Sequence, residues 1–178
     1  MSINVPLESD LLEALAESKT ASECLMVAYD VLEDGIDSLL KRIFYKDDYA
    51  VKYVVEPLLT SDGPLSDILI RGKLLLGLGV ISKDFYDDVD IFVTLKRWVK
   101  VQDNEVSFLE TDVIFELNKV HAIQKIMPIY FDNSVMEDLS ESMHDMYIDN
   151  YTQKVISTIT LAVTDMLTVL AKSNALTS

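Results

Sequence analysis

The sequence has few of the residues that mark secreted, disulfide-bonded or turn-rich proteins. Its 178 residues include one cysteine, so no disulfide can form within the chain. Five glycines and four prolines are few for a protein of many short strands and turns, while 49% of the residues are apolar. The composition therefore predicts an ordinary globular protein, and the length suits one domain with a single core.

Patterns typical of export and of membrane insertion are also lacking. The first 17 residues carry acidic side chains where a signal peptide needs basic ones. The most apolar late run, residues 156–171, contains Asp165, which is costly in lipid and ordinary on a helix in water. Cys24 stands beside Leu25, Met26 and Val27, as a buried thiol would. We therefore expect a protein of the reducing cytoplasm that does not enter the membrane.

Basic residues are scarce. Lysine and arginine together number 15 against 30 acidic residues, which gives a formal net charge of -15. Residues 1–40 carry one lysine against nine carboxylates, and residues 132–149 carry no lysine or arginine. A polyanion is repelled by DNA unless its basic residues are strongly segregated. The charge therefore argues against direct DNA binding.

Helical spacing of apolar residues runs through nearly the whole chain. It predicts an all-α fold: a single-domain multi-helix bundle over residues 1–178, with about six to eight helices, a long C-terminal helix and short flexible ends near 1–6 and 173–178. The expected helices begin at 6 or 9, 20, 47 or 48, 64 or 66, 82, 111 and about 143, and they end near 18, 45, 56, 77, 101, 124 and 169. Thr20 and Glu23 have capping-box spacing, and Ser82 is a second expected N-cap.

A helix-turn-helix is the first DNA-binding pattern to test, over residues 64–79 and 82–101. The second helix begins with four aspartates, which would meet phosphate oxygens with like charge: Asp84, Asp87, Asp88 and Asp90. Near its end lies a basic cluster of Lys96, Arg97 and Lys100 around Trp98. We interpret this cluster as a solvated helix face with Trp98 turned to the core, and direct DNA binding through its three cations stays open as an alternative.

Patterns for catalysis and metal binding are weak. Glu141 and His144 have the spacing of one half of a di-iron motif, but no second such motif exists around His121. The glycines from Gly72 to Gly79 end a helix, whereas a phosphate-binding loop begins one. Cys24 lies in an apolar run, and no Gly-x-Ser-x-Gly is present. We therefore predict a protein that is not an enzyme, with no catalytic residues, cofactor or metal.

Four short motifs in the middle of the chain follow one another in order: KDDYAVKY at 46–53, EPLL at 56–59, DGPL at 62–65 and GLGVI at 77–81. With these motifs the chain resembles the mannitol operon repressor family. The resemblance implies a cytoplasmic, all-helical bacterial protein that lowers the expression of genes for mannitol uptake and use. It also implies a repressor without a recognisable DNA-binding motif, in agreement with the charge.

We accordingly predict a transcriptional repressor or co-regulator of the mannitol utilisation operon that acts through protein–protein contacts. The expected partner is a DNA-bound regulator or a component of the sugar phosphotransferase system, and the sequence leaves homodimerisation open. The alternative is a HEPN-like RNA-acting or toxin–antitoxin protein. Ribonucleases of that superfamily place a histidine four to six residues after an arginine, whereas no histidine follows Arg97 before His121.

The segment that carries the resemblance also contains a predicted corner, in which Pro57 ends one helix and Gly63 with Pro64 turns the chain into the next. Five charged residues around this corner form the candidate partner-binding surface: Lys46, Lys52, Glu56, Asp62 and Arg71. If they contact a partner, charge reversal at Lys52 or Arg71 weakens repression in cells without lowering the melting temperature.

Overall fold

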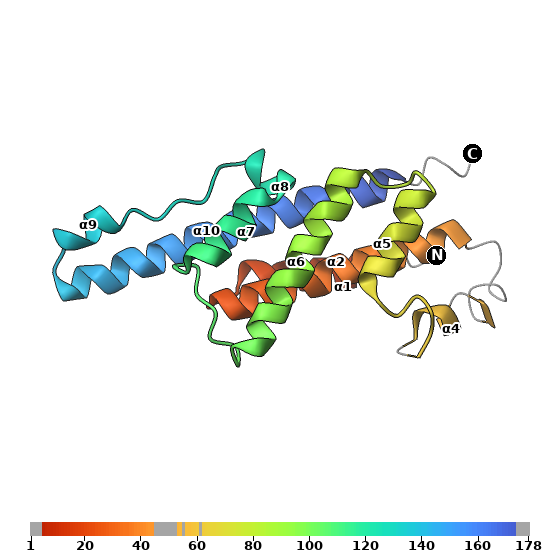
Figure 1. Cartoon of the computed structure of the whole chain (residues 1–178), viewed down its shortest axis with the longest axis horizontal. Coiled ribbons are helices and arrows are strands. Elements are labelled where there is room, and N and C mark those ends of the chain that lie inside the picture. Colours follow the sequence, from red (N-terminus) through yellow and green to blue (C-terminus); the bar gives the residue numbers. More distant parts are fainter. Residues whose placement is uncertain (1–4, 45–52, 55, 61, 174–178) are drawn as a thin grey trace.

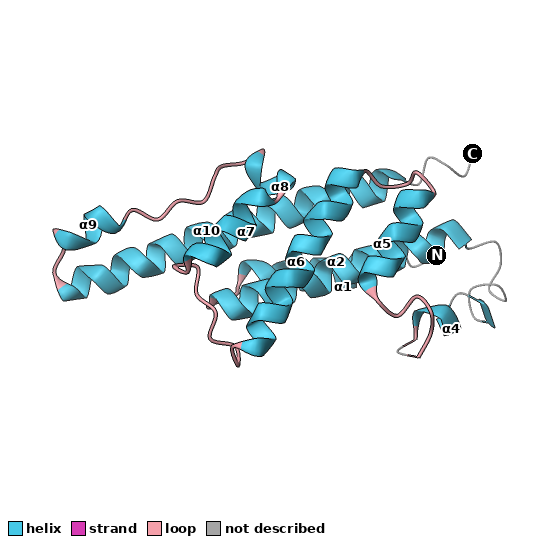
Figure 2. Ribbon diagram, viewed as in Figure 1, coloured by secondary structure: helices cyan, strands magenta, loops and turns pink. Residues whose placement is uncertain are grey.

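The structure is a computed structural model that describes residues 5–44, 53–54, 56–60 and 62–173. The described residues form nine helices and no strand (Figures 1 and 2). Their bounds are α1 Val5–Ala16, α2 Ala21–Phe44, α4 Glu56–Leu59, α5 Ile68–Gly77, α6 Lys83–Val101, α7 Thr111–Lys119, α8 His121–Gln124, α9 Asn133–Glu137 and α10 Glu141–Lys172. The all-helical class and the long C-terminal helix are thus confirmed.

The two longest helices, α2 and α10, pack against each other and form the centre of the bundle. Helices α1 and α6 also pack on α2, α5 packs on both α2 and α6, and α8 covers part of α10. Figure 1 shows α9 and the N-terminal half of α10 extending past the ends of the other helices. The bundle is therefore compact around α2 and open along one end of α10.

Apolar stripes at helical spacing build the core, as the sequence predicts. From α2, the buried side chains include Leu25, Ala28, Leu32, Ile36 and Leu39. From α10, they include Tyr151, Val155, Ile159, Ala162 and Met166. Toward the two ends of α10, the apolar side chains of Met143 and Val169 are 52% and 40% exposed.

Two predicted helix starts are confirmed by their hydrogen bonds. The Thr20 hydroxyl accepts from the backbone N–H of Glu23 at 3.1 Å, and the Glu23 carboxylate accepts from the backbone N–H of Lys19 at 2.9 Å. The Ser82 hydroxyl accepts from the backbone N–H of Phe85 at 3.1 Å, directly before α6. Each cap satisfies a donor that the first turn of a helix leaves free.

Three predicted boundaries are wrong. Helix α5 begins at Ile68 behind the N-cap Asp67, and not at Pro64 or Ser66. The single helix predicted over 111–124 is divided at Val120, whose φ of -66° and ψ of 117° are extended, and its N-cap is Glu110. Pro57 does not end a helix but lies in the first turn of α4, where its missing N–H costs little.

The expected helix start at Asp47 or Asp48 lies outside the described residues, as do the chain ends 1–4 and 174–178. Of the ends predicted to be flexible, Val5 and Pro6 belong to α1, and Ser173 caps α10. The Ser173 hydroxyl donates to the backbone carbonyls of Val80 at 3.1 Å and Val169 at 2.9 Å. These bonds tie the end of α10 to the turn that precedes α6.

Within the described residues, α10 is long and apolar enough to cross a membrane by length and composition. A core helix meets the same criterion, and α10 supplies nine buried residues to the bundle. Cys24 is fully buried on α2, and burial raises the pKa of its thiol to about 12. The interpretation of Cys24 as a small buried apolar residue is therefore confirmed.

Candidate functional site

The predicted corner lies between α2, α4 and the start of α5. Of its five charged residues, Lys46 and Lys52 are outside the described part of the chain. Glu56 is the first residue of α4, and Asp62 is exposed on the turn that follows this helix. Helix α4 and the turn that follows it lie at one end of the bundle (Figure 1).

Arg71 differs from the other four, because its side chain is only 6% exposed. Its Nη1 pairs with Asp37 of α2 at 2.5 Å, and its Nη2 donates to the carbonyls of Ser66 at 3.0 Å and Leu59 at 3.4 Å. Its Nε donates to the carbonyl of Leu65. The prediction that Arg71 presents its charge to a partner is therefore corrected: the guanidinium fastens the corner to α2 from inside.

An apolar hollow accompanies these charges. It has a volume of about 140 Å³ and is lined by Leu40, Phe44, Val54, Leu58, Leu59, Leu65 and Leu74. Phe44 is 39% exposed and Val54 is 55% exposed, so the lining reaches the surface. The sequence prediction missed this hollow because it considered only the charged residues of the corner, whereas the apolar signal is a set of leucines on α2, α4, α5 and the turn before α5.

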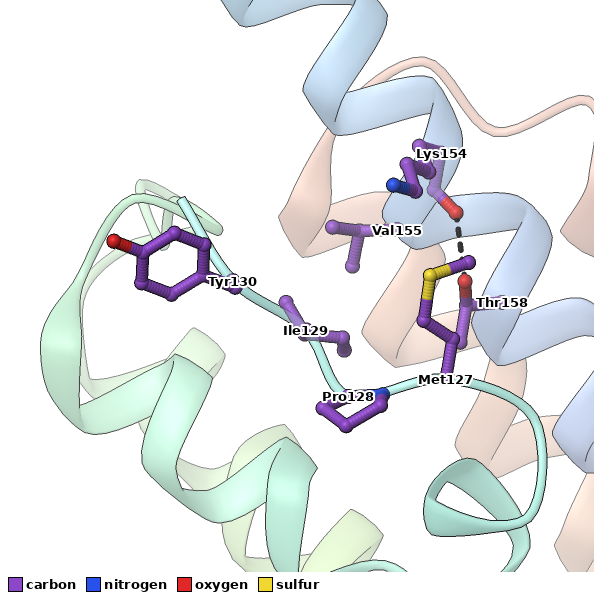
Figure 3. A pocket seen from close by; sticks show the side chains of 7 residues that line it. All are labelled: Met127, Pro128, Ile129, Tyr130, Lys154, Val155 and Thr158. Carbon is purple, nitrogen blue, oxygen red and sulfur yellow. Dashed lines mark hydrogen bonds between the residues drawn. The ribbon is translucent and has the colours of Figure 1, made fainter. Parts of the chain in front are cut away.

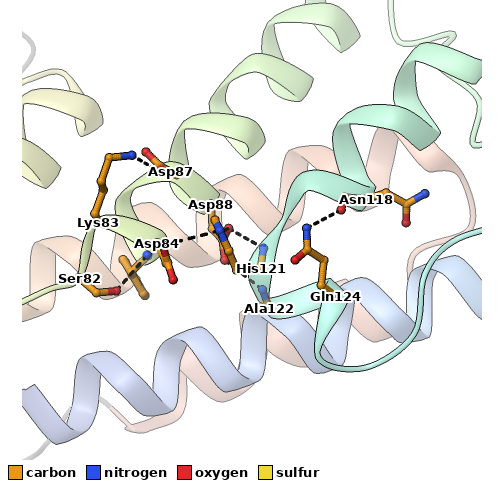
Figure 4. Close-up of polar contacts among 10 residues, drawn as sticks. Ser82, Lys83, Asp84, Asp87, Asp88, Asn118, His121, Ala122 and Gln124 are labelled. Atoms are coloured by element: carbon orange, nitrogen blue, oxygen red, sulfur yellow. Dashed lines mark hydrogen bonds and ion pairs between the residues drawn. The ribbon is translucent and has the colours of Figure 1, made fainter.

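A second polar cluster joins α6 to α8, as Figure 4 shows. The Asp88 carboxylate is 4% exposed and accepts from the backbone N–H groups of His121 at 2.7 Å and Ala122 at 3.1 Å. It also lies 2.9 Å from Nδ1 of His121. Asp88 thus supplies the cap that α8 lacks in its own sequence. Of the four aspartates at the start of α6, Asp88 is therefore buried and bonded within the fold.

The His121 ring lies between two acidic side chains. Its Nε2 is 3.6 Å from the carboxylate of Asp84, and the ring is 38% exposed. The hydrogen bond to Asp88 is the main cause that raises the pKa of His121 above its ordinary value. Beside the pair is a hollow of about 120 Å³ whose lining also includes Lys125 and Asp165. Asp88 thus caps α8, and His121 is a histidine that binds a proton beside the carboxylates of Asp84 and Asp88.

A third hollow, of about 260 Å³, lies where residues 127–130 cross α10 (Figure 3). Met127 and Ile129 point toward Val155 and Thr158 of α10, and the Thr158 hydroxyl donates to the Lys154 carbonyl at 3.0 Å. The Thr158 hydroxyl is thus occupied within its own helix, and Lys154 is the one charged side chain in this lining. The hollow offers little chemistry beyond apolar contact.

The remaining sequence candidates take structural places. Trp98 is half-buried against the core, as predicted, while Lys96, Arg97 and Lys100 lie along the outer face of α6. Nε2 of His144 lies 2.5 Å from the carbonyl of Met136. Among the described residues, no group of three or more histidine, cysteine or acidic side chains could hold a metal ion.

The model of the family described as "Mannitol repressor" matches residues 7–171. The chain belongs to this family. The mannitol operon repressor of Escherichia coli K12 is 34% identical over 168 residues, which cover 94% of this chain and 84% of the relative. Fumarase E of Shigella flexneri is 30% identical over 125 residues, 69% of this chain and 73% of that protein. The resemblance carried by the four central motifs is thereby confirmed.

Two solved structures share the fold of this mannitol repressor family member. One is a chain of the X-ray structure of the MtlR–HPr complex from Escherichia coli. It is 34% identical and superposes with a TM-score of 0.76, over 93% of this chain and 99% of that one. A possible transcriptional regulator of Shigella flexneri, YggD, is 27% identical with a TM-score of 0.71, over 92% and 98%. The HEPN-like alternative finds no support in these comparisons.

Proposed function

We propose that this protein is a repressor or co-regulator of the mannitol utilisation operon and that it acts by binding another protein, HPr. The observation that carries the proposal is the likeness, along almost the whole chain, to the MtlR solved together with HPr. HPr is a component of the sugar phosphotransferase system, which is one of the two kinds of partner that the sequence predicts. We further propose that the chain works as one helical domain in the cytoplasm, without a cofactor.

The charge distribution supports a protein target over DNA. Helices α5 and α6 have the order of a helix-turn-helix, but the first turns of α6 present Asp84, Asp87 and Asp90. Carboxylates at the start of a recognition helix repel the phosphates that should position it. Lys83, at the same end, is already paired with Asp87 at 2.6 Å. DNA is therefore contacted by a partner and not by this chain.

We propose that the corner is the surface that receives HPr. A protein interface needs an apolar centre that excludes water and a polar rim that fixes orientation. The leucine-lined hollow supplies the centre, and the exposed Asp62 contributes to the rim; Lys46, Lys52 and Glu56 are the other charged residues of the candidate surface in this part of the sequence. The corner also lies inside the segment that carries the four family motifs.

An enzymatic role is not part of the proposal, although one relative is named Fumarase E. The described Asp88–His121 pair has the spacing of a catalytic dyad, but Asp88 already accepts three hydrogen bonds as the cap of α8. Asp84 and Asp165 stand beside the histidine. A dicarboxylate substrate would meet like charge on entering this hollow.

The test is calorimetric titration of the purified protein with HPr, using the wild type, Val54→Asp and Lys52→Glu. A carboxylate at Val54 would be buried without a partner in the interface, so binding should weaken at least tenfold. Met146→Asp is the matched control, because Met146 is also exposed (63%) but lies on the far arm of α10. Absence of binding by the wild type would overturn HPr as the partner. Equal binding by wild type and Val54→Asp would overturn the corner alone.

A further inference from the structure

Three cations near the end of α6 line a hollow of about 250 Å³ that the proposed function does not use. Lys96, Arg97 and Lys100 form one side of this hollow. Tyr29 of α2 and the three residues that lead into α5, 66–68, form the other side. The lining therefore comes from three segments that are far apart in the sequence, and the packing of α2, α5 and α6 holds them in place.

Lys96 is held in position before any ligand arrives. Its Nζ lies 3.5 Å from the centre of the Tyr29 ring, and the Tyr29 hydroxyl donates to the Glu33 carboxylate at 2.7 Å. A cation over an aromatic face is attracted by the ring quadrupole, so the ammonium has a preferred place. Burial, and then the neighbouring Lys100, lower the pKa of Lys96. An anion in the hollow would favour the charged form of Lys96 and offset its repulsion by Lys100.

None of the three cations forms an ion pair with a residue in the described part of the chain, whereas Arg71, Lys83 and Lys119 each do. Asp30 and Glu33 act on Lys96 only from a longer distance. Most other lysines and arginines in the described part of the chain are also unpaired, so what distinguishes these three is that they adjoin one another around one hollow. Three adjacent cations without an ion-pair partner are therefore available for an external anion.

The opposite wall has a different chemistry. Asp67 caps α5 by accepting from the backbone N–H of Leu69 at 2.8 Å, and Ser66 stands before it. Carboxylate and hydroxyl oxygens are hydrogen-bond partners for the hydroxyl groups of a ligand. The positive end of the α5 dipole also faces this side. The hollow thus combines a cationic side for an anionic group with a side that accepts hydroxyl donors.

We propose that this hollow binds a small phosphorylated polyol, with the phosphate on Lys96, Arg97 and Lys100 and the polyol hydroxyls on Ser66 and Asp67. The Asp67 carboxylate lines the same hollow and would repel a second phosphate, so the site suits one phosphate group and not the successive phosphates of a nucleic acid strand. This ligand goes beyond the proposed function, and its recognition does not depend on HPr.

The test is calorimetric titration of the full chain at fixed ionic strength with mannitol 1-phosphate, inorganic phosphate, mannitol and a single-stranded oligonucleotide. We expect saturable binding of mannitol 1-phosphate and no heat from mannitol. Lys96→Gln and Lys100→Gln should each weaken this binding at least tenfold. Lys73→Gln is the matched control, because Lys73 is exposed on α5 outside the hollow, and its affinity should stay within twofold of the wild type.

Each other result overturns part or all of the proposal. No heat with any of the phosphates overturns the site. Equal affinity for inorganic phosphate and mannitol 1-phosphate overturns the polyol contacts, and binding of the oligonucleotide alone assigns the cations to nucleic acid. HPr titration of Lys96→Gln and Lys100→Gln, run in parallel, separates failure of this inference from failure of the proposed partner, because these variants should bind HPr like the wild type.

Discussion

Arg71 is an interior cation, and the geometry of its guanidinium explains why the position needs arginine. Its planar group donates to Asp37, to the backbone carbonyl of Leu59 at the end of α4, and to those of Leu65 and Ser66 in the turn before α5. An ammonium carries its donors on a single nitrogen and cannot span these acceptors in the same way. The residue therefore determines the shape of the corner while contributing nothing to its outer charge.

The first prediction follows from this burial. Arg71→Met should lower the free energy of unfolding by about 3–5 kcal/mol, because it leaves Asp37 and the carbonyls without their donor. Urea unfolding of the two proteins measures the difference. Lys73→Met, on the same helix and exposed, should change the value by less than about 0.5 kcal/mol. A loss below about 1 kcal/mol for Arg71→Met would contradict the structural role.

The second prediction concerns His121, whose pKa is raised chiefly by the hydrogen bond to Asp88. A group with a raised folded pKa adds stability in full below its unfolded value, about 6.5, and loses it as the pH rises through the folded value. Asp84, Asp87 and Asp88 all favour the protonated ring. The melting temperature of the wild type should therefore fall, relative to that of His121→Asn, as the pH increases from about 6 to 8.

Thermal unfolding of the two proteins across this pH range measures the difference. Subtracting the melting temperature of His121→Asn from that of the wild type at each pH removes the effect of the other titrating groups, which both proteins share. A difference that stays constant, or that grows with pH, would contradict the ion pair as the source of the effect.

At the scale of helices, the close approach of α2 and α10 depends on Gly35. A Cβ at this position would lie 2.7 Å from Cδ2 of Leu167 and 3.0 Å from Cδ1 of Leu170. Gly35→Val places two further carbons there and should cost about 1–3 kcal/mol of stability by overpacking. Gly77 has no neighbour within 4 Å of such a Cβ, so Gly77→Val is the control and should be neutral within about 0.5 kcal/mol.

Chemical denaturation followed by circular dichroism measures both variants. If Gly35→Val were as stable as the wild type, Leu167 and Leu170 would have to move aside without cost. Combining Gly35→Val with Leu167→Ala makes the space directly, and it should recover part of the lost stability.

Local patterns predicted the helices whose signals are local. The capping box at Thr20 and the Ser82 cap each use residues three positions apart, and both are confirmed. The break at Val120 has no such signal, because neither glycine nor proline stands there. Its cause is the Asp88 carboxylate, which caps α8 from 33 residues earlier in the chain.

The candidate site was predictable only where its signals lie within a short stretch of sequence. The corner could be found from its motifs and its glycine and proline residues, but the place of Arg71 depends on Asp37, 34 residues away. The leucines of the apolar hollow come from three helices and the turn before α5, so no single stretch of sequence displays them. Single-sequence patterns therefore gave the region but not the roles of its residues.

At the scale of the whole molecule, the net charge of -15 governs what the protein can approach. A promoter duplex should show no saturable binding in fluorescence anisotropy, even at low salt, because the three cations of α6 are few against this charge. A random duplex serves as the control. Binding that prefers the promoter and survives near-physiological salt would contradict a purely protein-mediated repressor.

Helix α10 is supported by the core along only part of its length, because its first part extends past the bundle together with α9. None of the residues from Glu141 to Asn150 is buried, whereas burial begins at Tyr151 and recurs as far as Leu170. At 1.5 Å per residue the 32-residue helix is about 48 Å long, and its first third lacks the core contacts that support the rest. Amide hydrogens in that third should therefore exchange with solvent through local fraying, while those of the buried stretch beyond Tyr151 should exchange only when the bundle opens. A single continuous helix therefore carries a steep gradient of exchange protection along its length.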